Sequence, residues 1–248
     1  NIKMLPAPYG WLLQRQERAD NIIQFIKELD LYDIIFFQEA FSSSIGKKIY
    51  SELESIYPYA VEPDDQTAFY KSNSGLWVIS RLPITLKQHI SFTKLMEWDK
   101  LASKGAKLFS IIKYEQEFYL INTHMQADYK IDYSDIRISQ YTEINNNFLL
   151  PNKKSKAPLI LCGDLNIAHP EKLNIMLGKL KLRNGPLFGN LQHSTLGSNK
   201  YLLDYILMRA EDYNIYRVKR RIIDFPSTIN EGEANLSDHY PIEAVFSW

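Results

Sequence analysis

The sequence has a single cysteine, no net charge and no long apolar run, and each of these absences excludes a class of protein. The lone Cys162 cannot form an intramolecular disulfide, and its place in the apolar segment PLILCGD predicts a buried, inert thiol. No stretch reaches the roughly 18 to 20 consecutive apolar residues of a membrane-spanning helix. Lys plus Arg and Asp plus Glu number 29 each, so no overall positive field attracts a polyanion, and we expect no stable nucleic-acid partner.

The sequence also lacks internal repeats, charge blocks and low-complexity linkers that would divide it. Its 248 residues, with 45% hydrophobic and 23% charged residues, are typical of a globular protein with a sizeable core. We therefore expect one domain over residues 1–248. The chain starts at Asn1, without an initiator Met or an apolar signal segment, so we expect it to be a processed chain from which an N-terminal segment has been removed.

Short apolar runs alternate with segments of helical periodicity along the whole chain. Apolar residues at helical spacing predict helices at 15–29, 43–56, 134–150 and 170–181. Runs rich in β-branched and aromatic residues predict strands at 33–37, 75–80, 107–114, 117–124, 158–166, 201–208, 214–224 and 241–248. Nearly continuous apolar strands need cover on both faces, so the pattern predicts an α/β fold: a four-layer α/β sandwich with two packed mixed β-sheets flanked by helices.

Polar side chains gather at the ends of these predicted strands. Glu39 and His124 each follow an apolar run, and Asp164 and Asn166 follow another, two residues apart and so on one side of an extended chain. The pair Asp238-His239 precedes the last strand. Taken singly, each is also compatible with an ordinary loop carboxylate or a hydrogen-bonded histidine. Taken together, they predict one site at one rim of the sheets.

The residue types in this set suit metal-assisted phosphoryl transfer. Carboxylates such as Glu39 and Asp238 are ligands that Mg²⁺, Mn²⁺ or Ca²⁺ prefer, whereas one cysteine and separated histidines do not make a structural zinc site. A histidine that works as a base needs a carboxylate to fix its tautomer, and both Asp204 and Asp238 are candidates for that partner.

The motifs, in order, resemble those of the endonuclease/exonuclease/phosphatase superfamily of metal-dependent phosphoesterases, over nearly the whole chain. They are NIKMLP with Asn1, Gln38-Glu39, SGLWVISRLPI, NTHMQAD, GDLN, LDYI and SDHYPI. Within the superfamily, NIKMLP, QEAF, SKG at 103–105, THMQAD and SDHYPIEA resemble the neutral and bacterial sphingomyelinases. The resemblance implies a fold like that of DNase I.

The resemblance also implies a metal centre. By it, Glu39 and Asn1 correspond to the metal-binding pair, and Asp238 lies near the metal. The cofactor implied is Mg²⁺, with Mn²⁺, Co²⁺ or Ca²⁺ able to take its place.

The same resemblance assigns catalytic roles. His239 corresponds to the general base and Asp204 to the carboxylate that orients it. Asp164 and Asn166 correspond to residues that hold the phosphate and the attacking water. His124 corresponds to the histidine that stabilises the transferring phosphoryl group or protonates the leaving oxygen. Asp238 is the other acidic position around the base.

The implied function is an Mg²⁺-dependent phosphodiesterase of phospholipase C type that hydrolyses sphingomyelin to ceramide and phosphocholine. Its partner would be phospholipid at a membrane surface, and its setting a protein secreted by a bacterium. Two alternatives stay open. One is a nuclease, or another lipid or sugar phosphodiesterase on the same fold. The other is a lipid-surface binding module without turnover.

The sequence departs from the secreted bacterial sphingomyelinases where they carry an aromatic hairpin shortly before the SDH motif. Here the aromatic residues of 209–236 are only Tyr213, Tyr216 and Phe225. We therefore expect a reduced or absent anchor, and a substitute contact from the segment 91–101, through Met96 and Trp98, with Phe41 near the mouth of the site. The alternative is that 91–101 belongs to the core.

Overall fold

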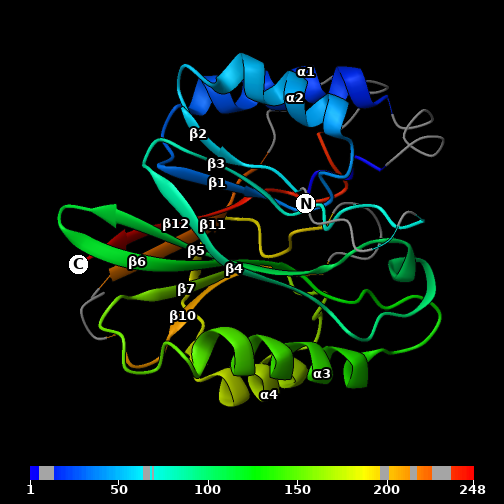
Figure 1. Ribbon diagram of the computed structural model, residues 1–248, viewed down its shortest axis with the longest axis vertical. Helices are drawn as coiled ribbons and strands as arrows, with labels where there is room; N and C mark the ends of the chain where they lie inside the picture. The colour runs from blue at the N-terminus through cyan, green and yellow to red at the C-terminus, as the bar shows by residue number, and fades with distance from the viewer. Residues whose placement is uncertain (6–13, 64–67, 69, 196–200, 213–216, 225–235) are drawn as a thin grey trace.

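The computed structural model describes residues 1–5, 14–63, 68, 70–195, 201–212, 217–224 and 236–248. Helices form the two outer layers and sheets the two inner ones (Figure 1). The helices α1 (Arg15–Leu29) and α2 (Ser43–Leu53) cover one side, and α3 (Ser134–Ile144) and α4 (Pro170–Leu180) cover the other. The predicted four-layer α/β sandwich is confirmed. That residues 1–248 form one domain stays a prediction.

The larger sheet has six strands in the order β4-β5-β6-β7-β10-β8. Its β6 and β7 are parallel and its other pairs antiparallel, so the sheet is mixed, as expected. All six residues of β7 are buried, which explains its continuous apolar sequence. The strands are β4 (Ile84–Ser91), β5 (Gly105–Lys113), β6 (Gln116–His124), β7 (Leu159–Asp164), β8 (Leu182–Arg183) and β10 (Asp204–Arg209).

The second inner layer consists of two three-stranded sheets where one continuous sheet was expected. Their orders are β1-β3-β2 and β12-β11-β9. The strands are β1 (Ile34–Phe37), β2 (Tyr59–Val61), β3 (Trp77–Ser80), β9 (Leu187–Phe188), β11 (Arg217–Ile222) and β12 (Ile242–Ser247). A cavity of about 680 Å³, lined by residues of both β1 and β12, lies between the two sheets.

Helical periodicity explains how the outer layers are held. The apolar stripe of α1 buries Ile22, Ile23 and Ile26 in the same core cluster as Ile45 and Ile49 of α2. Among the described residues, no helix is long and apolar enough to span a membrane.

The segment 91–101 divides between core and surface, which corrects part of the sequence-based expectation. Phe92 and Leu95 are buried in the core, whereas the Trp98 side chain is 66% exposed. Phe41 is only 9% exposed, so its predicted place on a membrane-facing surface is wrong. Its ring lies against Gly75, where an added Cβ would come within 2.7 Å of it. The aromatic residues Tyr213, Tyr216 and Phe225 lie outside the described residues.

Candidate active site

Strand register brings two aspartates and a histidine together at one rim of the six-stranded sheet. Asp164, the last residue of β7, pairs in register with Asp204, the first residue of β10, and with His124, the last residue of β6. Neighbouring strands lie about 4.8 Å apart, so the three side chains share one site. This pairing explains why the polar residues at the ends of the predicted strands lie together.

His239 joins the cluster from the segment before β12. Its Nδ1 lies 2.6 Å from Oδ2 of Asp204, and both residues are buried. Burial alone would lower the pKa of His239, but the charge of Asp204, its hydrogen bond and the charge of Asp164 outweigh burial and raise that pKa to about 9. Asp204 thus occupies the position from which a carboxylate fixes the tautomer of a base, leaving Nε2 for chemistry.

Asp164 is a buried carboxylate that lies between two histidines. Burial, followed by the negative charge of Asp204, raises the pKa of Asp164 to about 6. Its Oδ2 lies 3.9 Å from Nε2 of His239 and 3.7 Å from Nε2 of His124, beyond hydrogen-bond distance in both cases. The carboxylate is therefore placed between the two histidines without being satisfied by either.

Glu39 and Asp164 converge on one point, which gives a fit test for a divalent cation. The side-chain amide Nδ2 of Asn1 lies 2.8 Å from Oε1 of Glu39 and 3.0 Å from Oδ2 of Asp164. Ligand atoms of Asp164, Asp204 and His239 also lie within 4.8 Å of one another. Two converging carboxylates, one of them buried and with a raised pKa, form a hard-oxygen donor set that fits Mg²⁺.

Asp238 lies beside the cluster and has a different partner. Its Oδ2 accepts a hydrogen bond from Nζ of Lys3 at 2.7 Å, and its side chain is 45% exposed. The structure does not bring its carboxylate into the group formed by Asp164, Asp204 and His239. The expectation that Asp238 lies near the metal stays a prediction.

Asn166 is held by the turn that follows β7. Its φ of 52° is left-handed, a conformation that Asn tolerates better than most residues. Its main-chain N–H donates to Oδ1 of Asp164 at 3.1 Å, and its Nδ2 donates to the carbonyl of Met125 at 3.0 Å. The turn therefore fixes Asn166 next to Asp164, although the chain here is not extended as the two-residue spacing was taken to predict.

Lys104 is a site residue to which sequence reasoning assigned no role. Its buried ammonium lies 2.9 Å from Nε2 of His124 and 2.8 Å from Oδ1 of Asp99. Burial, followed by the charge of Lys104, holds the pKa of His124 well below its ordinary value, so this imidazole is neutral. Nε2 therefore accepts from Lys104, and the proton of His124 resides on Nδ1. The SKG motif was the only available signal, and it carried the family resemblance without a role.

A buried pair of amides joins the two inner layers beneath the site. Nε2 of Gln38 donates to Oδ1 of Asn122 at 2.7 Å, and Asn122 donates to the carbonyl of Phe37 at 3.1 Å. Asn122 and His124 are two residues apart on β6 and therefore share one face of the strand. Gln38 and Asn122 stand in the motifs Gln38-Glu39 and NTHMQAD that carried the family resemblance, but the sequence assigned neither of them a role.

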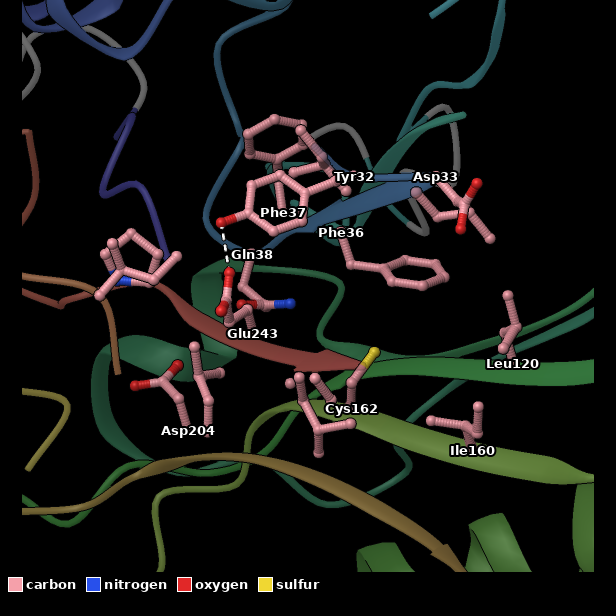
Figure 2. Close-up of a pocket in the computed structure, with 18 of the residues that line it drawn as sticks. Tyr32, Asp33, Phe36, Phe37, Gln38, Leu120, Ile160, Cys162, Asp204 and Glu243 are labelled. Carbon is pink, nitrogen blue, oxygen red and sulfur yellow. Dashed lines mark hydrogen bonds between the residues drawn. The ribbon is translucent and has the colours of Figure 1, made fainter. Parts of the chain in front are cut away.

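Asp204 and His239 of the cluster also line the cavity between β1 and β12, part of which is drawn in Figure 2. Asp204 lies at one side of it, and the apolar side chains of Leu120 and Ile160 line another part. Cys162, which also lines it, donates to the carbonyl of Ile121, and burial raises the pKa of its thiol to about 12. The expectation of a buried thiol is confirmed, and such a thiol is inert at neutral pH.

Comparison with known proteins identifies the family that combines this four-layer fold with carboxylates at the strand ends and a His–Asp pair. Residues 1–239 match the Endonuclease/Exonuclease/phosphatase family, so the chain belongs to that family. A Sphingomyelinase C of Leptospira interrogans is 30% identical over 182 residues, which cover 66% of this chain and 32% of that protein. A Sphingomyelinase C of Bacillus cereus is 26% identical over 296 residues, covering 100% of this chain and 87% of that protein.

A solved structure shows the same fold. A mutant of beta toxin from Staphylococcus aureus, crystallised with bound magnesium ions, has a TM-score of 0.84 at 22% identity and covers 98% of this chain and 96% of its own. The chain spans about a third of the length of the Leptospira relatives, with 32% and 30% covered.

Proposed function

We propose that this chain is an Mg²⁺-dependent phosphodiesterase of phospholipase C type that hydrolyses sphingomyelin to ceramide and phosphocholine. The observation that carries the proposal is the Asp204–His239 pair placed beside the converging carboxylates of Glu39 and Asp164. The choice of sphingomyelin among phosphodiesters is supported by the names of the relatives.

His239 acts as the general base in this proposal. Because Nδ1 is bonded to Asp204, the nitrogen that takes the proton of the attacking water is Nε2. The proton moves to Nε2 as the water oxygen bonds to phosphorus, and the bond to the ceramide oxygen breaks in line. The resulting imidazolium is stabilised by Asp204 at 2.6 Å. The ceramide oxygen takes up a proton from water to give ceramide, and the imidazolium of His239 later returns its proton to water. The protein forms no covalent bond to the substrate.

Groups on the other side of Asp164 meet the charge of the phosphoryl oxygens. Asn166 and His124 lie next to Asp164, and the ammonium of Lys104 adds a buried positive charge there. Donors placed in advance in a site that excludes water are worth about 3 to 4 kcal/mol each. The neutral His124 carries its proton on Nδ1, which has no hydrogen-bond partner among the described residues.

The metal would be held by Glu39 and Asp164, with Asn1 and Asp238 as the further proposed contacts. A divalent cation held there would supply Lewis-acid stabilisation of the phosphate oxygens, and its positive charge would lower the pKa of the nearby His239 and so favour the neutral form that can take a proton.

The change Glu39→Gln tests the metal centre. It removes a unit of charge from the converging carboxylates, so we expect the Mg²⁺ concentration for half-maximal activity to rise about tenfold or more. Mg²⁺ should also raise the thermal midpoint of Glu39→Gln less than it raises that of the unaltered chain, while the metal-free midpoint stays nearly unchanged. The control is Glu52→Gln, which alters a surface ion pair with Lys27. Equal Mg²⁺ titrations for all three proteins would remove Glu39 from the metal centre.

The experiment that tests the function measures phosphocholine release from sphingomyelin vesicles with Mg²⁺ and with EDTA, beside nicking of a supercoiled plasmid. We expect release with Mg²⁺, none with EDTA, and no nicking. Nicking without release would identify the nuclease alternative. Vesicle binding with neither reaction would identify a binding module.

The proposed partner is phospholipid at a membrane surface, and the proposed setting is secretion by a bacterium. Both are supported by the bacterial sphingomyelinases among the relatives.

A further inference from the structure

Exposed apolar side chains gather on two segments next to the candidate site. On the short helix η2 (Glu97–Leu101), Trp98 is 66% and Leu101 47% exposed. On the loop after β6, Tyr129 is 42% and Ile131 61% exposed. Single exposed apolar residues are ordinary on a protein surface, but an aromatic and aliphatic group on two adjoining segments is not. We call these four residues the rim patch.

Hydrogen bonds hold the two segments together as one surface. Oδ1 of Asp99, the neighbour of Trp98 in η2, accepts from the hydroxyl of Tyr129 at 2.9 Å. Its Oδ2 accepts from the main-chain N–H of Ala127 at 2.9 Å. The hydroxyl of Tyr133 donates to Glu97 at 3.0 Å. The rim patch is therefore a fixed part of the structure.

The rim patch adjoins the catalytic cluster. Asp99 also forms a buried ion pair with Lys104 at 2.8 Å, and Lys104 lies 2.9 Å from His124. Lys104 is thus the one side chain between Asp99 of η2 and His124. A surface pressed against the rim patch would therefore lie near the catalytic cluster.

The charges of these two segments favour an anionic or zwitterionic surface. Three of their four acidic side chains are paired with a cation of the protein: the buried Asp99 with Lys104, and the partly exposed Asp128 and Asp132 with Arg137, Asp132 also with Lys172. The fourth, the exposed Glu97, accepts a hydrogen bond from Tyr133. The exposed lysines Lys100 and Lys130 have no ion pair within the part of the chain that the structure describes. Apolar and aromatic side chains beside free lysines are the composition of a lipid-interface contact.

We infer that the rim patch is the surface by which this chain docks on a lipid bilayer. Trp98, Leu101, Tyr129 and Ile131 enter the headgroup and acyl boundary, and Lys100 and Lys130 meet lipid phosphates. The inference rests on the proposed function, because a lipid substrate supplies the reason for a bilayer next to the site.

Flotation with vesicles that contain no substrate tests this inference apart from catalysis. Vesicles of phosphatidylcholine and phosphatidylserine in EDTA permit binding without turnover. We expect Trp98→Ala and Ile131→Ser each to weaken binding about tenfold or more, because each removes apolar area from the lipid. The matched control is Ile112→Ser: Ile112 is 65% exposed but lies near the far end of β5, about 24 Å along the strand from Gly105. We expect it to bind as the unaltered chain does.

Two further readouts make the result decisive. Adding vesicles should shift tryptophan emission to the blue in the unaltered chain and not in Trp98→Phe, which keeps an aromatic ring for binding. Trp98→Ala should slow hydrolysis of sphingomyelin vesicles and leave hydrolysis of a soluble phosphocholine ester within about twofold of that of the unaltered chain.

Binding that is unaltered in both rim variants, or lost equally in Ile112→Ser, would overturn the inference. So would a loss of self-association, by sedimentation, in place of a loss of vesicle binding. If no phosphocholine ester is cleaved by the unaltered chain, the proposed function fails, while flotation still judges the patch.

Discussion

Replacing His239 with alanine is expected to lower kcat for phosphodiester hydrolysis about a thousandfold or more. Nε2 of His239 is the proton acceptor that the structure places beside Asp164, and Asp204 holds the ring through Nδ1. Positioned general bases contribute roughly 10² to 10⁴ in rate, and the loss should fall in the upper half of this range because the base is oriented by a buried carboxylate.

A second substitution separates lost chemistry from lost folding, since alanine leaves the buried Asp204 unpaired. His239→Gln keeps a hydrogen-bond donor for that carboxylate and cannot take a proton at neutral pH. We expect it to lose activity to the same degree while its thermal midpoint stays closer to that of the unaltered chain. The control is His169→Ala, since the His169 side chain is 56% exposed. Activity within tenfold of the unaltered chain in either His239 variant would remove His239 from the mechanism.

Asp204→Asn is expected to lower kcat by about 10² to 10⁴ although it alters only the group behind the base. An amide at position 204 can donate to Nδ1, which moves the proton to Nε2 and leaves no lone pair to accept a proton from water. The KM for a soluble phosphocholine ester should change little, because Asp204 makes no proposed contact with substrate. A rise in KM as large as the fall in kcat would instead indicate that the site has collapsed.

The titration of His239 in the metal-free protein gives a readout that a merely structural role would not move. Its pKa is raised to about 9, against burial, chiefly by Asp204. By NMR in EDTA, we expect that pKa to fall toward the ordinary value of about 6.5 in Asp204→Asn. A raised folded-state pKa stabilises the protein fully below about pH 6.5, and the contribution is lost as pH rises through about 9. The difference in thermal midpoint between the unaltered chain and Asp204→Asn should therefore decrease as the pH rises from about 6.5 to about 9.

The layer order and the rim that holds the site were predictable because both follow from local patterns. The helix predicted at 15–29 is α1, since the spacing of Ile22, Ile23 and Ile26 requires one buried stripe. Polar residues after apolar strands predicted that Glu39, His124 and Asp164 would meet. The predicted strands were too long at the site: β7 ends at Asp164 and β10 begins at Asp204.

The partners within the site were harder to predict, because they depend on register between distant segments. From the residues alone, Asp204 and Asp238 were both candidates for the partner of His239, and the family resemblance favoured Asp204. The pairing of β10 with β7 is what places Asp204 against the ring. Nothing in the sequence around Lys104 distinguishes it from a surface lysine. Its burial beside His124 follows from the packing of distant segments. Phe41 was assigned to the surface because nothing local shows that Gly75 receives its ring.

Hydrolysis of sphingomyelin in water enriched in ¹⁸O, with both products analysed by mass spectrometry, tests the central claim most directly. If water activated by His239 attacks phosphorus and the ceramide oxygen leaves, one ¹⁸O enters phosphocholine and none enters ceramide. Label in the ceramide hydroxyl, or release of free choline with ceramide phosphate, would contradict the account.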